Sequence, residues 1–130
     1  MNSRIEFVLD SSALLALLRG EPGGDSVRSV LETSVIGAVN YSEVLTKMIR
    51  KGTPASLASQ MLQAVRLAVV PFDQPLALEG ADLAAYGWTH GLSLADRACL
   101  TLARHHQVPA VTADRRWKIR GLPVKVRFIR

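Results

Sequence analysis

The sequence predicts an α/β fold with a mostly parallel central sheet. Short apolar segments, several of them β-branched, alternate along the chain with longer segments of helical periodicity, and strands that alternate with helices pair in parallel. Some of the short segments end at a helix-capping residue, which is typical of strand-to-helix turns. The chain has 130 residues, and we expect a single domain over residues 1–130.

The first half of the chain is expected to contain two strands and three helices. In order, these are a strand at 5–9, helices at 11–18 and 25–32, a strand at 35–39 and a helix at 41–51. Gly20 and Pro22 end the first helix, because neither residue is favourable inside one. Asn40 is a favoured N-cap residue and is expected to precede the helix at 41–51.

The second half alternates in the same way. In order, we expect a helix from 54 to about 66, a buried strand at 67–72, a helix from 75 to about 86, a helix at 93–106, a strand at 110–113 and an edge strand at 124–128. Pro54 and Pro75 can each occupy the first turn of a helix. Right-handed crossovers place every strand-to-helix turn at one edge of such a sheet. Asp10 and Asp114 are therefore expected at the same edge.

The formal net charge is +5, and the excess of basic residues lies toward the C-terminus. From residue 97 onward, the Lys and Arg residues are opposed by Asp114 alone. This part of the chain should attract phosphates. A solvated basic surface would have the same composition, so charge alone identifies no function.

The cysteine content and the lengths of the apolar segments indicate where in the cell the protein is located. Cys99 is the only cysteine, which excludes an internal disulfide and a thiolate zinc cluster and fits the reducing cytoplasm as the expected location. The apolar run at 13–18 is far shorter than the ~20 residues that span a bilayer. We therefore expect no membrane partner.

Acidic residues stand at several of the predicted junctions. Asp10 and Asp114 follow predicted strands and could simply cap the next turn. Asp73 has the same kind of position, and the pattern does not separate it from them. Asp96 lies three residues after Ser93, which is the spacing of a capping box. It is also the first residue on the apolar face of its helix. A carboxylate that enters a core needs a cation nearby.

The chemistry of such a group follows from its ligand type. Several carboxylates without a pair of His or Cys ligands favour Mg²⁺ or Mn²⁺. An acidic group beside a basic surface fits hydrolysis of phosphodiester bonds. Glu43 is aligned with Lys47 and Arg50 on the polar face of its helix, so periodicity alone predicts a solvated residue there.

Other side chains near these acids are candidates for contact with a substrate. They are hydroxyl or cationic residues, namely Ser12, Thr112, Arg97, Arg115, Arg116 and Lys118. Ser and Thr are also routine turn residues, and Arg97 could instead lie on the solvent face of its helix. Trp88 and Trp117 could stack on bases, although packing against the sheet is the more common fate of a tryptophan.

Four segments together resemble the PIN domain and, within it, the VapC-type toxin ribonucleases of bacterial toxin–antitoxin pairs. They are VLDSSALL at 8–15, NYSEV at 40–44, LADRACL at 94–100 and VTADR at 111–115. The resemblance covers nearly the whole chain and implies a three-layer α/β/α sandwich with four to five strands. It also implies Mg²⁺- or Mn²⁺-dependent endonucleolytic cleavage of RNA by a catalytic, metal-binding quartet of Asp10, Glu43, Asp96 and Asp114. It thereby favours Glu43 over Asp73, which periodicity does not do.

The resemblance further implies a homodimer and a cognate antitoxin whose C-terminal segment occupies the acidic groove. Two other functions fit the same residues. A receiver-like or phosphoryl-transfer domain would also gather acids around Mg²⁺, but a receiver has paired acids after its first strand, where this chain has Ser11 and Ser12. A non-catalytic RNA-binding module would use the basic C-terminal third without metal and without need of Asp96.

Overall fold

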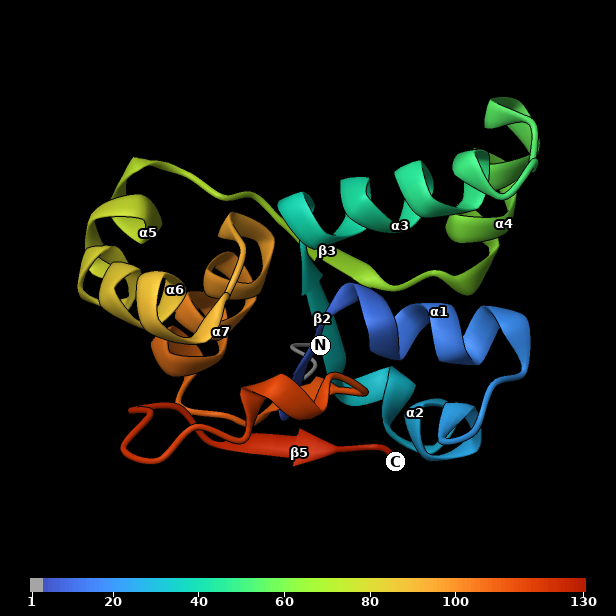
Figure 1. Cartoon of the computed structure of the whole chain (residues 1–130). Helices are drawn as coiled ribbons and strands as arrows, with labels where there is room; N and C mark the ends of the chain where they lie inside the picture. The colour runs from blue at the N-terminus through green and yellow to red at the C-terminus, as the bar shows by residue number, and fades with distance from the viewer. Residues whose placement is uncertain (1–3) are drawn as a thin grey trace.

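Five strands form one central sheet, and all of them are parallel (Figure 1). They are β1 (Phe7–Leu9), β2 (Ser34–Gly37), β3 (Ala68–Val70), β4 (Ala110–Thr112) and β5 (Val126–Phe128), in the order β3-β2-β1-β4-β5. The structure is a computed structural model in which residues 4–130 are described. The predicted parallel sheet of four to five strands is confirmed.

In residues 4–130, α-helices connect the first four strands, and a 3-10 turn lies between β4 and β5. The helices are α1 (Ser11–Arg19), α2 (Gly24–Val30), α3 (Ala38–Arg50), α4 (Ala55–Val65), α5 (Gln74–Glu79), α6 (Ala84–His90) and α7 (Leu94–His106), with short 3-10 turns at Leu31–Thr33, Ala81–Leu83 and Arg115–Trp117. The longest of them span 13 residues. Nowhere in this described part of the chain does a helix have the length and apolar character needed to cross a membrane.

The helices cover both faces of the sheet, because successive side chains of a strand point to opposite faces. Val8 of β1 packs in a cluster with Leu100 and Leu102 of α7. The next residue, Leu9, packs with Ala13 of α1 and Val27 of α2. In Figure 1, α5, α6 and α7 gather on one side of the strands and α1 to α4 on the other. The expected three-layer α/β/α arrangement is therefore confirmed.

The start of α3 differs from the prediction. Gly37, in an extended conformation, is the N-cap of α3, and Asn40 lies inside the first turn. Asn40 is 1% exposed, and its side-chain amide donates a hydrogen bond to the Ala95 carbonyl at 3.0 Å. The prediction of Asn40 as N-cap was wrong because α3 begins before it: Asn40 lies inside the helix, its Nδ2 donates to α7, and its Oδ1 accepts no hydrogen bond from the first turn. Local preference for a cap gave way to tertiary packing.

Two other segments also differ. The predicted buried strand at 67–72 is β3, an edge strand on which Val69 is 41% exposed. The helix expected from 75 to about 86 is interrupted after Glu79. At Gly80 a Cβ atom would lie 2.1 Å from Thr101 Oγ1, so the backbone there approaches α7 too closely for a side chain. The chain then passes through a 3-10 turn into α6.

The carboxyl ends of β1 and β4 define the edge of the sheet that matters for function. β1 and β4 are paired neighbours, with Leu9 opposite Val111. Asp10 directly follows β1, and Asp114 follows β4 by two residues. Parallel neighbours end at the same edge, so both residues lie at that edge, as the alternation of strands and helices predicted.

Candidate functional site

Asp10 is a buried carboxylate at the end of β1, with 3% of its surface exposed. One of its oxygens accepts hydrogen bonds from Ser12 Oγ at 2.7 Å and from the Ala13 backbone N–H at 2.9 Å, and the other accepts from Thr112 Oγ1 at 2.6 Å. Asp10 is therefore the N-cap of α1. A role as cap does not exclude a further role, because the carboxylate is charged and faces the edge of the sheet.

Ser12 and Thr112 link the ends of β1 and β4 through their hydroxyls. Ser12 Oγ accepts from the Ala113 N–H at 2.9 Å, and Thr112 Oγ1 accepts from the Asp114 N–H at 2.9 Å. Both hydroxyls also donate to Asp10. Thr112 has no exposed surface through which to touch a substrate. The two hydroxyls thus hold Asp10 in position.

We expect Thr112→Val to lower the free energy of unfolding by roughly 1–3 kcal/mol, because one oxygen of the buried Asp10 carboxylate and the Asp114 N–H each lose the hydrogen bond to the threonine hydroxyl. Chemical denaturation of the wild type, Thr112→Val and Thr112→Ser measures this. Thr112→Ser keeps the hydroxyl and is the matched control. If the valine variant is no less stable than the serine variant, the hydroxyl does not support Asp10.

Asp96 lies in the first turn of α7. Its carboxylate accepts from the Ser93 N–H at 2.9 Å, and Ser93 Oγ accepts from the Asp96 N–H at 3.1 Å. The capping box that the spacing of these residues predicts is confirmed. One carboxylate oxygen is engaged in the box, and the first turn of α7 thereby fixes the direction of the side chain.

Asp114 is held by Arg116, which lies two residues further along the chain. Arg116 Nη2 is 2.7 Å from one carboxylate oxygen, Nε is 3.1 Å from both, and the Arg116 backbone N–H also donates to Asp114. This guanidinium is the main cause of a pKa for Asp114 below its usual value. Asp114 is therefore charged, and its partner is a neighbouring cation.

Glu43 reaches the same region from α3. Its carboxylate accepts a hydrogen bond from Ser11 Oγ, and Lys47 Nζ lies 3.9 Å from its other oxygen. Lys47 is the neighbour expected from the helical pattern. Ser11 is 4% exposed. The sequence did not predict its contact with Glu43, because Ser11 and Ser12 are adjacent residues of the same type. In α1, Ser11 points to Glu43 and Ser12 to Asp10.

Asn40 is a second residue that the sequence did not link to the site. Its hydrogen bond to the Ala95 carbonyl joins the first turn of α3, one turn before Glu43, to the first turn of α7, which carries Asp96. Asn40 lies one turn before Glu43, but its role could not be predicted from this spacing, because it depends on how α3 and α7 pack together.

The four carboxylates influence one another electrostatically, and we call Asp10, Glu43, Asp96 and Asp114 the acidic site. Burial raises the pKa of Asp10 to about 6, against several hydrogen bonds that lower it, and the charge of Asp96 raises it further. Burial also raises the pKa of Asp96, with contributions from the charges of Asp114 and Glu43. Asp96 is thus the member that interacts with all three others.

The acidic site fits a divalent cation by its chemistry. Its members are oxygen ligands of like charge, and a cation between them would relieve the repulsion that raises the pKa of Asp96. Within residues 4–130, however, no group of three or more acidic, histidine or cysteine side chains is arranged to hold a metal ion. The carboxylates are turned to local partners, so binding of a cation requires some of these side chains to turn.

The remaining candidates have other partners, and Asp73 lies apart from the acidic site, beside Leu102, His105 and His106 toward the C-terminal end of α7. Asp73 caps α5 by accepting from the Leu76 N–H at 3.2 Å, after the edge strand β3. Arg97 packs along α6, since a Cβ atom at Gly87 would lie 3.2 Å from its Nε. Arg115 donates to the Arg130 carbonyl at 3.2 Å and lies 4.7 Å from the centre of the Phe128 ring.

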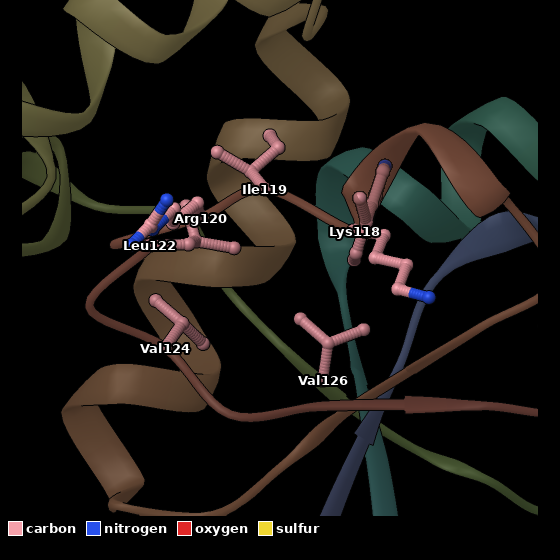
Figure 2. A pocket seen from close by; sticks show the side chains of 7 residues that line it. Lys118, Ile119, Arg120, Leu122, Val124 and Val126 are labelled. Carbon is pink, nitrogen blue, oxygen red and sulfur yellow. The ribbon is translucent and has the colours of Figure 1, made fainter.

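Lys118 lines a cavity of about 510 Å³ between the segment after Asp114 and β5. Figure 2 shows the apolar side chains that surround it with Lys118 and Arg120, namely Ile119, Leu122, Val124 and Val126. The cavity is lined by none of the acidic-site residues. A basic and apolar cavity therefore lies beside the acidic edge and is separate from it.

Comparisons with known proteins agree with the fold. A family model described as the PIN domain matches residues 7–121. No curated protein sequence matches the chain. Among solved structures, FitAcB from Neisseria gonorrhoeae is 20% identical, with a TM-score of 0.70 over 95% of this chain and 97% of the other.

Two further structures are similar. VapBC2 from Rickettsia felis, bound to a DNA fragment from its promoter, is 12% identical, with a TM-score of 0.74 over 95% of this chain and 98% of the other. VapBC-5 from Mycobacterium tuberculosis, a member of the VapBC family of toxin-antitoxin systems, is 18% identical, with a TM-score of 0.60 over 99% of both chains. At these identities the likeness concerns the fold.

Proposed function

The chain belongs to the PIN domain family, and from this membership we propose that it is a Mg²⁺- or Mn²⁺-dependent endoribonuclease that acts as the toxin of a toxin–antitoxin pair. The observation that carries the proposal is the acidic site, whose like charges act on one another at the carboxyl edge of the sheet. Ligands of parallel α/β sheets bind at that edge. The excess of basic residues favours a polyanionic substrate.

In this proposal the acidic site would hold the metal ion. When bound, Mg²⁺ or Mn²⁺ supplies Lewis-acid stabilisation of the charge that develops on the reacting phosphate. Ser12 and Thr112 hold Asp10, and the capping box with Ser93 holds Asp96. These contacts keep two carboxylates in place before any ligand arrives, which reduces the cost of ordering them.

Arg116 has two proposed roles. It neutralises Asp114 while no cation is present, and it becomes free to bind a phosphate of the substrate when Asp114 turns to the metal. Arg97, Arg115 and Lys118 are the further cations proposed to bind the RNA backbone. Ser12 and Thr112, expected from the sequence to contact the substrate, support the carboxylates in this proposal.

Partners are proposed from the family and from similar structures. Several of these are toxin–antitoxin complexes, including one from Klebsiella pneumoniae that is 15% identical, with a TM-score of 0.71. We propose a cognate antitoxin that covers the acidic site, a homodimer in solution and a cytoplasmic location. Size-exclusion chromatography with light scattering tests the dimer.

The test of the proposed function is cleavage of purified total RNA by the antitoxin-free protein in Mg²⁺, in Mn²⁺ and in EDTA. Discrete products that require metal support the ribonuclease and identify its target. If the folded protein binds RNA in EDTA but cleaves none of it with either metal, the non-catalytic RNA-binding module replaces the proposed enzyme.

We expect Arg116→Ala to weaken binding of RNA and to make its dependence on salt shallower, with the slope of log K against log salt reduced by about 1. The physical reason is the loss of one phosphate contact and its released counterion. Fluorescence anisotropy with a labelled, cleavage-resistant RNA analogue, at a fixed Mg²⁺ concentration and several concentrations of monovalent salt, measures the slope, with Arg116→Lys as the control that keeps the charge. An unchanged slope would mean that Arg116 serves Asp114 only.

A further inference from the structure

The two tryptophans of the chain have opposite environments. Trp117 is 1% exposed and packs in the core, as a lone tryptophan was expected to do. Trp88, on α6, is 85% exposed, and Leu94 at the start of α7 is 59% exposed. The expectation of packing is therefore wrong for Trp88. We call the stretch from α6 to the first turn of α7, residues 84–97, the α6–α7 corner.

The α6–α7 corner meets the acidic site at Asp96, which belongs to both. The residue before Trp88 is Gly87, where a Cβ atom would lie 3.2 Å from Arg97 Nε and 3.4 Å from Arg97 Cδ. The Arg97 side chain thus packs on the backbone beside Trp88, and Arg97 itself follows Asp96. In Figure 1, α6 and α7 lie side by side on the same side of the sheet. Arg97 therefore brings the helix that carries Trp88 into contact with the first turn of α7, which carries Asp96.

The charge around α6 is positive on two sides. Arg97 lies on one side. On another, the Tyr86 hydroxyl donates to the Gly121 carbonyl at 3.2 Å, which places α6 next to the segment that carries Lys118 and Arg120. No acidic residue occurs from 84 to 95. An exposed aromatic ring on a helix that is flanked by cations is a combination with which proteins bind single-stranded nucleic acid.

We propose that the α6–α7 corner is a binding site for single-stranded RNA, in which a base stacks on Trp88 and Arg97 binds a neighbouring phosphate. The inference rests on the proposed function, since it extends the path of the substrate away from the acidic site. The RNA is single-stranded there, because bases inside an A-form helix are stacked on one another and present no free face. Stacking on an indole accepts any base, so this contact adds affinity and little sequence preference.

The exposure of the two tryptophans makes a direct test possible. Acrylamide quenches the fluorescence of an exposed indole and not that of a buried one, so quenching reports on Trp88. The experiment uses the full chain as Asp96→Asn, in EDTA, with a short single-stranded RNA of mixed sequence. We expect bound RNA to protect Trp88 from acrylamide.

Matched variants separate stacking from charge. We expect Trp88→Ala to bind RNA about tenfold more weakly or worse, whereas Trp88→Phe retains most of the affinity. Trp88→Ala should leave the salt slope unchanged, because stacking releases no counterion, and Arg97→Gln should reduce the slope by about 1. Leu57→Ala is the control for loss of an exposed apolar side chain, since Leu57 lies on α4 at the opposite end of the molecule (Figure 1).

Two results would overturn the inference. One is that RNA binds Trp88→Ala as tightly as it binds the parent protein and, in the parent protein, leaves the quenching of Trp88 by acrylamide unchanged. The other is protection of Trp88 by higher protein concentration without RNA, which would make the corner an interface between copies of the chain. Neither result depends on cleavage. Protection by RNA in a protein that never cleaves would overturn the proposed enzyme and leave this binding site standing.

Discussion

Asp96→Asn is expected to abolish cleavage of RNA, with a loss of about 10³-fold or more. The acidic site is proposed to stabilise the reaction through a metal ion, and several kcal/mol of transition-state stabilisation correspond to a factor of this size. Asp96 has the largest expected effect because its charge interacts with all three other members of the acidic site. Initial rates on the RNA identified in the cleavage test measure the loss.

Folding should be unaffected by Asp96→Asn, since asparagine keeps the oxygen that accepts from the Ser93 N–H. Ser93→Ala is the matched control. It breaks the other half of the same capping box, so it should lower stability by about 1 kcal/mol and retain the activity. Activity that survives in Asp96→Asn, or that is lost in Ser93→Ala without unfolding, would contradict the role of Asp96 as a ligand.

The stability of the metal-free protein is expected to rise as the pH falls from about 7 to about 5, by roughly 1 kcal/mol through Asp10 alone. Burial raises the pKa of Asp10 from the ordinary value of 3.8 to about 6. The folded protein therefore binds this proton more tightly than the unfolded chain does. The resulting contribution is fully present below about pH 3.8 and is lost as the pH rises through about 6.

Chemical denaturation in EDTA at several pH values measures this effect, with Asp10→Asn as the variant that cannot titrate. The difference between the two proteins isolates Asp10 from every other titrating group. Mg²⁺ should also stabilise the wild type at neutral pH, because it binds only the folded state, and should have little effect on Asp10→Asn. A pH dependence that is the same in both proteins would show that Asp10 is solvated in solution.

Most of the fold was predictable from the sequence, because the signals are local. The order of strands and helices, the cap at Asp73 and the capping box at Ser93 and Asp96 follow from side chains a few residues apart. The exceptions arose at contacts between distant segments. The backbone at Gly80, where the expected helix is interrupted, lies against Thr101 of α7, and Asn40, expected as a cap, lies inside α3 and donates to the Ala95 carbonyl.

The candidate site divides in the same way. The sequence by itself determined that acids stand at the ends of the first and fourth strands and at the start of the last helix, because periodicity and capping place them there. Glu43 joined them through the family resemblance and not through periodicity. Only the tertiary structure decided that Ser11 contacts Glu43, that Asn40 joins α3 to α7, and that Trp88 is exposed while Trp117 is buried. Such relations depend on which helix faces pack together, and this packing brings together residues that are far apart in the chain.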